Sequence, residues 1–226
     1  MKTSELFEKE LEFISNEDLR NIVIDTLDHA PKCIQTISAS SSMKYHPKAD
    51  IKIGHYNDDG TVETGGLVNH IKTVTAICRC LMDSDNFKDI VFGTTFKPQS
   101  AEDYEQLILY QDCAIAACIL HDCCKASDED EKHVTKFEHP LLAAKLFVHC
   151  AKQYVNDDNK VVMKKAVALT YGAIASHMGC WNEAKYAPGI ILPKPMNGLE
   201  VIVHLSDYIA SRKFIDFNFE VYENSF

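Results

Sequence analysis

The sequence predicts an all-α fold, and three observations support this prediction. Apolar residues recur at intervals of three and four along most of the chain, as they do on one face of a helix. The 226 residues include nine glycines and seven prolines, so few positions interrupt a helix. One long stretch, residues 38–66, lacks this spacing and is rich in Ser, Asp and Gly. We therefore expect one helical domain over residues 1–226, with an irregular insertion near residues 47–65.

The elements follow from local signals, in chain order. Residues 3–29 are amphipathic and are expected to form one or two helices, which Pro31 ends. The insertion contains "NDDGT", residues 57–61, a turn sequence that favours a short hairpin. A loop is expected around "FGTTFKPQ", residues 92–99. Further helices are predicted at about residues 67–82, 104–120, 139–155, 160–177 and 198–215.

Composition and charge exclude several classes of protein. No run approaches about 18 uncharged apolar residues, so we expect no membrane span, and the N-terminus lacks the apolar segment of a signal peptide. The net charge of −10 and a total of three arginines argue against a basic track for long nucleic acid. The nine cysteines are an odd number without a C-x-x-C pair. They predict reduced thiols in a cytoplasmic protein.

Histidines and aspartates recur at the ends of the predicted helices. The stretch "CILHDCCK", residues 118–125, runs from an apolar helix directly into a His-Asp pair. A single histidine beside an apolar face is more often structural. Burying several titratable groups together is costly, however, unless they are paired or bind a cation. Imidazole and carboxylate together suit a divalent transition metal. The candidates are His70, His121, Asp122, His139, His177 and Asp207.

This order of residues, H…HD…H…H…D, resembles the HD superfamily of metal-dependent phosphohydrolases. The matching segments are "GGLVNHIKTV", "ILHDCCK", "FEHP", "ASHMG" and "VIVHLSDYIASR", within a motif core of about residues 38–213. The local sequence around these motifs is most similar to the branch of bacterial HD-type 3′–5′ exoribonucleases and small phage HD proteins. That branch likewise has a Ser-rich "S-x-K-x-H" segment before the first ligand and a lysine at the position of Lys125. Met178 stands where its motif has a second histidine.

The resemblance implies an HD-domain helical bundle with one or two divalent ions, of Mn, Fe, Ni, Zn or Mg. By that resemblance the first ion is held by His70, His121, Asp122 and Asp207. Asp122 bridges to a second ion, which His139 and His177 hold.

Other residues are candidates for catalysis or substrate binding. Lys125, three residues beyond Asp122, is placed to meet a phosphate oxygen beside this catalytic aspartate. Lys44 and His46 are candidate phosphate contacts. His204, three residues before Asp207, either orients that carboxylate or touches substrate. For Trp181, the single tryptophan, stacking on a base is the alternative to the favoured reading, packing in the core.

The resulting hypothesis is a metal-dependent phosphohydrolase, a phosphomonoesterase or phosphodiesterase that uses metal-activated water. Its expected partner is a small phosphorylated substrate: a nucleotide, a dinucleotide or a short oligonucleotide. Two alternatives stay open, a 3′–5′ exonuclease on single-stranded RNA or DNA and a non-catalytic nucleotide-binding protein. A bacterial or phage-infected cell is the expected setting. Neither a membrane nor long nucleic acid is an expected partner.

Overall fold

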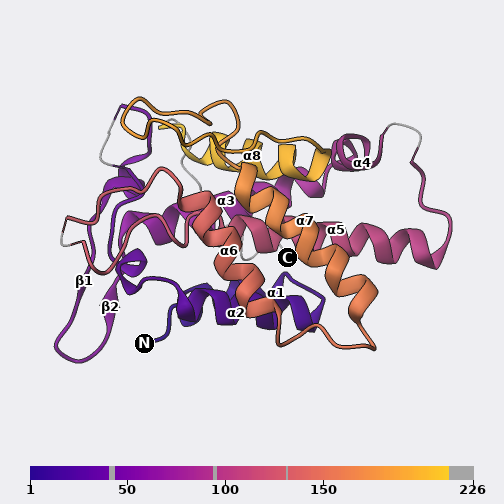
Figure 1. Cartoon of the computed structure of the whole chain (residues 1–226), viewed down its shortest axis with the longest axis horizontal. Coiled ribbons are helices and arrows are strands. Elements are labelled where there is room, and N and C mark those ends of the chain that lie inside the picture. Colours follow the sequence, from indigo (N-terminus) through magenta and orange to yellow (C-terminus); the bar gives the residue numbers. More distant parts are fainter. Residues whose placement is uncertain (41–43, 94–95, 131, 214–226) are drawn as a thin grey trace.

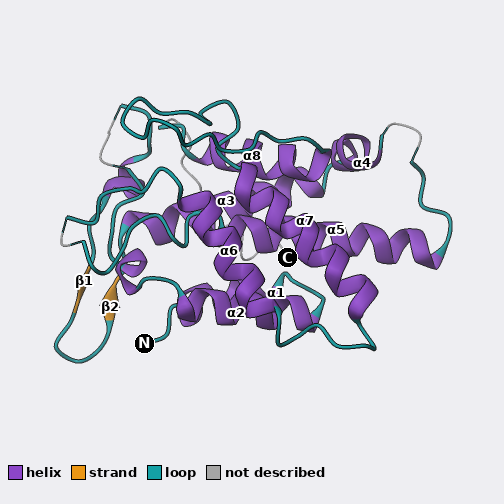
Figure 2. Cartoon of the chain, in the orientation of Figure 1, coloured by secondary structure: helices purple, strands orange, loops and turns teal. Residues whose placement is uncertain are grey.

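The computed structural model describes residues 1–40, 44–93, 96–130 and 132–213 (Figure 1). Helices account for most of these residues, and a single small two-stranded sheet accompanies them in the described part (Figure 2). The prediction of an all-α fold is therefore confirmed. The α-helices are α1 Glu8–Glu12, α2 Glu17–His29, α3 Gly66–Met82, α4 Asp85–Phe92, α5 Ala101–Leu120, α6 His139–Ala151, α7 Lys160–Ser176 and α8 Gly198–Ala210. Short 3-10 helices span Ser4–Phe7, Lys32–Gln35 and Lys48–Ile51.

The hairpin expected in the insertion is present. Strand β1, His55–Tyr56, pairs antiparallel with β2, Val62–Glu63. In the turn between them, the Asp59 carboxylate accepts hydrogen bonds from the backbone N–H and the hydroxyl of Thr61. This local bonding is the reason that an aspartate-glycine turn predicts a hairpin.

One helix was not predicted, and two helices end earlier than predicted. α4 lies in a region where no helix was expected, because eight residues are too short for a clear periodic signal. α6 ends at Ala151 rather than near residue 155. α8 ends at Ala210, where the side chains of Ser211 and Arg212 donate to the carbonyl of Tyr208 and replace the next helical bonds. The last part of that predicted helix, residues 214–215, lies outside the described residues.

α5 is the central helix of the bundle. It packs against α2, α3, α7 and α8, and its second half, residues 112–120, is buried on every side. A helix surrounded in this way must be apolar all round, which explains the run of Ala, Ile, Leu and Cys. Figure 1 shows α5 running along the long axis of the molecule, with α8 and α3 on one side and α2 on the other. The C-terminal end of α5 therefore lies in the interior of the bundle.

Two further expectations are met within this fold. All nine cysteines are free thiols, as their apolar contexts predict, and seven of them are buried. In the described part of the chain, no helix combines the length and hydropathy that a bilayer crossing requires.

Candidate metal centre

The six predicted metal ligands converge at the C-terminal end of α5. They are His70 from α3, His121 and Asp122 after α5, His139 at the start of α6, His177 after α7 and Asp207 from α8. α3 packs against α5 and α8, while α7 packs against α5, α6 and α8. These contacts bring residues that lie far apart in sequence into one cluster.

The cluster is buried but not sealed from solvent. The four histidines and Asp122 are each at most 3% exposed. The side chain of Asp207 is 21% exposed, and those of Lys125 and His46 are 13% and 17% exposed. The cluster therefore opens to solvent beside Asp207.

Asp122 lies between two groups of imidazoles. Its Oδ1 is 2.9 Å from Nε2 of His139 and 3.7 Å from Nε2 of His177. Its Oδ2 is 3.5 Å from Nε2 of His121 and 4.0 Å from Nε2 of His70. Each carboxylate oxygen thus faces a different pair of rings, which is the arrangement that a bridging ligand needs.

Asp207 completes the half of the cluster nearest to solvent. Its Oδ1 is 3.1 Å from Nε2 of His70 and 3.9 Å from Nε2 of His121. The ligand atoms of His70, His121 and Asp207 all lie within 4.8 Å of one another, and the same is true of His121, Asp122 and His177. His121 belongs to both sets, so the two groups of ligands share a ring.

Three of the rings have their tautomer fixed by the backbone. Nδ1 of His121, His139 and His177 lies 2.7, 2.6 and 2.8 Å from a carbonyl oxygen three residues earlier. Because a carbonyl only accepts, each Nδ1 carries a hydrogen, and a neutral ring then has its lone pair on Nε2. A backbone bond of this kind is the usual support of a metal-ligating histidine.

Inside the cluster the Nε2 atoms and carboxylate oxygens outnumber the hydrogen-bond donors that face them. Nε2 of His121 is buried and has no hydrogen-bond partner among the described residues. Nε2 of His139 lies 3.3 Å from Nε2 of His177 and 2.9 Å from an oxygen of Asp122, so three acceptors crowd one point. A cation, or an additional proton on a ring, is needed to make this arrangement favourable. The donor set therefore fits a divalent metal ion.

The electrostatics keep two rings in the form that binds metal. Burial, together with the neighbouring rings of His121 and His139, lowers the pKa of His177 to about 3. Burial also lowers the pKa of His121. For Asp122, burial favours the neutral acid, but the charge of Lys125 and the facing imidazoles outweigh it and hold the pKa well below its usual range. At neutral pH the rings of His121 and His177 are thus neutral and Asp122 is ionised.

His70 has the opposite behaviour. Burial alone lowers its pKa, but hydrogen bonds to Asp207 and Asp50 outweigh burial and raise the pKa to about 9. The same hydrogen bond shifts the pKa of Asp207 in the opposite direction. Burial favours the neutral form of this carboxyl, but the bond to His70 outweighs burial and lowers its pKa. In the metal-free chain His70 is therefore doubly protonated at neutral pH and donates to both carboxylates.

Asp50 is a member of the site that the sequence did not predict. It is 1% exposed, and its Oδ2 lies 3.2 Å from Nδ1 of His70 and 3.1 Å from Nδ1 of His46. Asn69 donates to its Oδ1. These bonds overcome the effect of burial and lower the pKa of Asp50 to about 2. Asp50 therefore orients His70 from behind, as the backbone carbonyls orient the other three rings.

The candidate catalytic and phosphate-binding residues lie near the opening of the cluster. Nζ of Lys125 is 2.5 Å from Oδ2 of Asp122, which places its charge beside the carboxylate. His46 reaches the cluster through Asp50. Nζ of Lys44 lies 5.1 Å from the ring centroid of its neighbour Tyr45. Whether these three side chains contact a substrate stays a prediction.

The contacts of His204 and the exposure of Trp181 differ in part from what the sequence predicted. Nδ1 of His204 lies 2.7 Å from the backbone carbonyl of His177, so this ring supports the turn after α7 instead of bonding to Asp207. The favoured expectation that Trp181 packs in the core is wrong, since the residue is 45% exposed. It follows a turn and stacks on Tyr208 at the surface, which a sequence pattern does not show.

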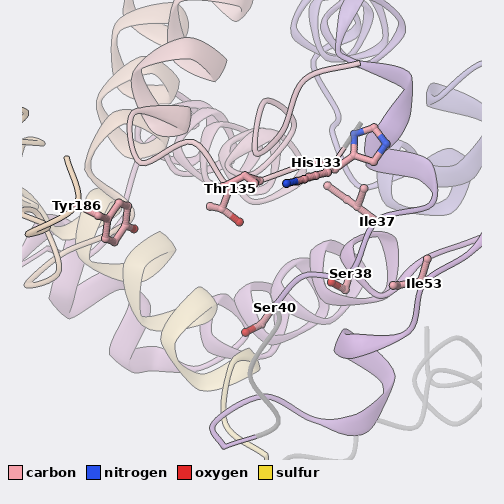
Figure 3. Close-up of a pocket in the computed structure, with 9 residues that line it drawn as sticks. Ile37, Ser38, Ser40, Ile53, His133, Thr135 and Tyr186 are labelled. Atoms are coloured by element: carbon pink, nitrogen blue, oxygen red, sulfur yellow. The ribbon is translucent and has the colours of Figure 1, made fainter. Parts of the chain in front are cut away.

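A surface pocket of about 620 Å³ lies between the insertion and the loops before α6 and α8 (Figure 3). Figure 3 shows Tyr186 on one side and His133 with Ile37 on the other. None of the nine described residues that line it is a predicted ligand. Its walls nevertheless adjoin the cluster, because Ala39 between two lining serines donates to the carbonyl of Asp50, and Lys136 supplies the carbonyl that faces His139.

Comparison of the chain with family models, curated proteins and solved structures finds no match. Among the described residues, the buried histidine and aspartate clusters can hold a metal ion.

Proposed function

We propose that this protein is a metal-dependent phosphohydrolase that cleaves a phosphoester of a nucleotide, a dinucleotide or a short oligonucleotide. The observation that carries the proposal is the crowding of imidazole nitrogens and carboxylate oxygens at one buried point. The order of these residues along the chain, H…HD…H…H…D, supports the same conclusion through its resemblance to HD phosphohydrolases. Mn, Fe, Ni, Zn and Mg are the candidate ions.

A bound divalent ion supplies the chemistry for this reaction, since it lowers the pKa of water and polarises a phosphoryl oxygen. The residues of the chain position that chemistry. Asp122 has one oxygen toward His139 and the other toward His121, so it is suited to hold one ion or to join two. Its ionised form is maintained by Lys125.

Lys125 also has a role toward substrate in this proposal. Phosphoryl transfer needs stabilisation of negative charge on the phosphoryl oxygens more than it needs a covalent intermediate. The Lys125 ammonium lies beside Asp122 with a partly exposed side chain, at the side where the cluster opens to solvent. A phosphate that approaches past Asp207 therefore meets a positive charge next to the ion.

The test is metal analysis combined with a panel of phosphoesters. The full chain is stripped of metal, reloaded with Mn²⁺ and assayed for release of phosphate or nucleoside monophosphate. We expect Asp122→Ala and His121→Ala to lose at least about 10- to 100-fold in metal affinity, as much as supporting residues usually cost, and to lose turnover with it. Asp157→Ala is the matched control, because this carboxylate is fully exposed.

Four outcomes separate the candidate functions and test the metal centre. Turnover of mononucleotides or dinucleotides that falls with Asp122→Ala supports the proposal. Laddered products from labelled single strands favour the exonuclease. An intact metal centre without turnover of any phosphoester rejects hydrolysis, and unchanged metal content in both variants rejects the centre itself.

A further inference from the structure

Five side chains form a cluster of rings and charge at the surface beside the metal centre, here called the aromatic platform. They are Tyr45, Trp181, His204, Tyr208 and Arg212. The rings of Trp181 and Tyr208 stack with centroids 5.5 Å apart and planes 15° apart. The His204 ring lies 6.0 Å from the ring of Trp181. The guanidinium carbon of Arg212 lies 4.4 Å from the Tyr208 centroid and 5.9 Å from that of Tyr45.

The large rings of the platform are exposed to a degree that packing does not explain. Tyr45 is 50% exposed, Trp181 45% and Tyr208 37%. Three such rings from separate segments, gathered on one patch, leave apolar area in water that the interior would otherwise cover. Contiguous exposed aromatic area of this kind marks a binding surface more often than it marks a packing defect.

The platform adjoins the residues of the metal centre and their supports at three points. Tyr208 directly follows Asp207, so their Cα atoms are about 3.8 Å apart. Tyr45 directly precedes His46, whose ring bonds to Asp50 behind the cluster. His204 bonds to the carbonyl of His177.

The turn that carries Trp181 is also held tightly against α8. Gly179 has φ +58°, and a Cβ at this position would lie 2.2 Å from Cε1 of His204. Only glycine accommodates both the conformation and the close approach. The position of Trp181 over α8 is therefore built into the fold.

Cationic side chains accompany the rings. The guanidinium of Arg212 covers Tyr208, and the ammonium of Lys44 lies over Tyr45. Lys125 adds a third positive charge at the opening of the cluster. In a chain with a net charge of −10, these cations provide a local site for an anion next to flat apolar surface.

We propose that the aromatic platform stacks the base of a nucleotide whose phosphate lies at the metal centre. The inference rests on the proposed function and assigns the binding of the base to named residues beside that site. A nucleobase offers the planar π-surface that Trp181 and Tyr208 match, and its phosphate matches the ion and the three cations. Stacking is tolerant of base identity, so we expect selectivity for the presence of a base rather than for a particular base.

The first experiment uses Trp181, the single tryptophan, as an intrinsic probe. AMP and ribose 5-phosphate are titrated separately into the full chain in EDTA, so that neither ligand is hydrolysed. We expect AMP to quench the tryptophan fluorescence and to bind about 5- to 100-fold more tightly than ribose 5-phosphate, the range expected for one stacked base. Equal affinities would overturn the proposal. If neither compound binds in EDTA, calorimetry is repeated with the Mn²⁺-loaded chain, and the absence of a preference for AMP there would overturn it.

Variants then assign the selectivity to the platform, and their binding is measured by calorimetry because both Trp181 variants lack the fluorophore. Trp181→Leu and Tyr208→Leu are each expected to lose most of the preference for AMP, while Trp181→Phe, which keeps a ring, retains most of it. Tyr104→Leu is the matched control. Tyr104 is 54% exposed in the first turn of α5, about 25 Å along that helix from His121. If Trp181→Leu and Tyr208→Leu both keep the preference, the platform does not bind the base.

The two proposals fail in distinguishable ways. Hydrolysis of ribose 5-phosphate in Mn²⁺, with no preference for AMP in EDTA, would remove the stacking role and leave the phosphohydrolase intact. A strong preference for AMP without turnover of any phosphoester would reject the phosphohydrolase proposal and support a base-binding site without catalysis.

Discussion

Local backbone bonds orient the imidazoles of His121, His139 and His177 so that Nε2 of each ring faces the cluster. Each ring is bonded through Nδ1 to a carbonyl three residues earlier, so its tautomer and its direction are set locally. The long-range part of folding has only to bring these prepared rings together. His70 differs, because its Nδ1 faces the carboxylate of Asp50, 20 residues earlier in the chain. The position of this ring therefore depends on the insertion.

Asp50→Asn tests that dependence. The substitution removes the negative charge behind His70 while keeping the shape of the side chain. We expect metal affinity to fall about 10- to 100-fold, the usual cost of losing a partner of a ligand. Competition with a metal indicator measures the affinity. Asp59→Asn is the matched control, since Asp59 bonds to Thr61 in the exposed hairpin turn. Equal affinity in Asp50→Asn and the wild-type chain would contradict the role of Asp50.

Proton release on metal binding tests the state of His70. Its pKa of about 9 lies above the usual value of 6.5, so the ring holds an extra proton throughout the range below about pH 9. A cation that binds to Nε2 must displace that proton, whereas His177, with its pKa of about 3, has none to lose at neutral pH. At pH 7.5 we expect release of about one proton per ion bound at His70, declining as the pH rises through 9. Calorimetry in HEPES and in Tris measures the release, and a heat that is independent of the buffer would refute it.

At this scale the sequence predicted the residues that converge better than it predicted the residues that support them. The six candidate ligands were recognisable because histidine and aspartate stood out beside apolar helix faces. Asp50 was hidden in a polar stretch, where an aspartate is ordinary. Its spacing of four from His46 was the one local signal. The exposure of Trp181 depends on a turn held by Gly179, and no periodicity reports on such a contact.

At the scale of elements, the start of α3 explains the paired glycines in "GGLVNH". A Cβ on Gly65 would lie 2.2 Å from the carbonyl oxygen of Thr36, and one on Gly66 would lie 2.1 Å from the carbonyl oxygen of Asp50. The backbone of two other segments is therefore pressed against the first turn of this helix. The close approach sets Asp50 directly behind His70, which lies one turn further along α3.

Gly66→Ala is expected to be strongly destabilising for this reason. The added methyl group meets rigid backbone, so the Lys48–Ile51 turn must shift. We expect the free energy of unfolding to fall by about 2 kcal/mol or more, with a loss of metal affinity. Denaturant unfolding measures the first effect and metal competition the second.

Gly172→Ala is the control for that substitution. Gly172 is also helical, but its Cβ would meet the end of the flexible Glu200 side chain. The helix propensity of alanine, about 1 kcal/mol better than that of glycine, offsets this contact. Similar losses of stability in the two variants would show that the backbone contact at Gly66 has no special cost.

The elements that the sequence predicted well are those with long periodic patterns. The helices near residues 67–82, 104–120 and 160–177 were expected from apolar spacing, and α3, α5 and α7 lie there. α4 was missed because a helix of eight residues gives about two turns of pattern. The early end of α8 depends on two side chains that bond back to Tyr208, a tertiary detail of the cap.

At the scale of the whole molecule, the centre joins helices that the chain connects only distantly. α3, α5, α6, α7 and α8, or the residues next to them, each contribute at least one candidate ligand. In the metal-free chain these helices meet over groups that repel one another, since three acceptors crowd between His139 and His177. We therefore expect the fold to gain stability when an ion binds.

Metal binding is expected to stabilise the whole chain. An ion that binds the folded state at a concentration of 100 times its dissociation constant adds about 2.7 kcal/mol to the free energy of unfolding. Thermal unfolding of the stripped and reloaded protein measures the change, with Mn²⁺ as the first ion tested. Asp122→Ala should lose this response. A melting temperature that is the same with and without metal would argue that the cluster is a structural network.

The exposure of Asp207 has a kinetic consequence. The other candidate ligands are each at most 3% exposed, whereas the side chain of Asp207 is 21% exposed. We therefore expect an ion to enter and leave past Asp207, so that its exchange needs rotation of this side chain and not opening of the bundle. Exchange should then keep its rate in mild urea, where global unfolding accelerates steeply.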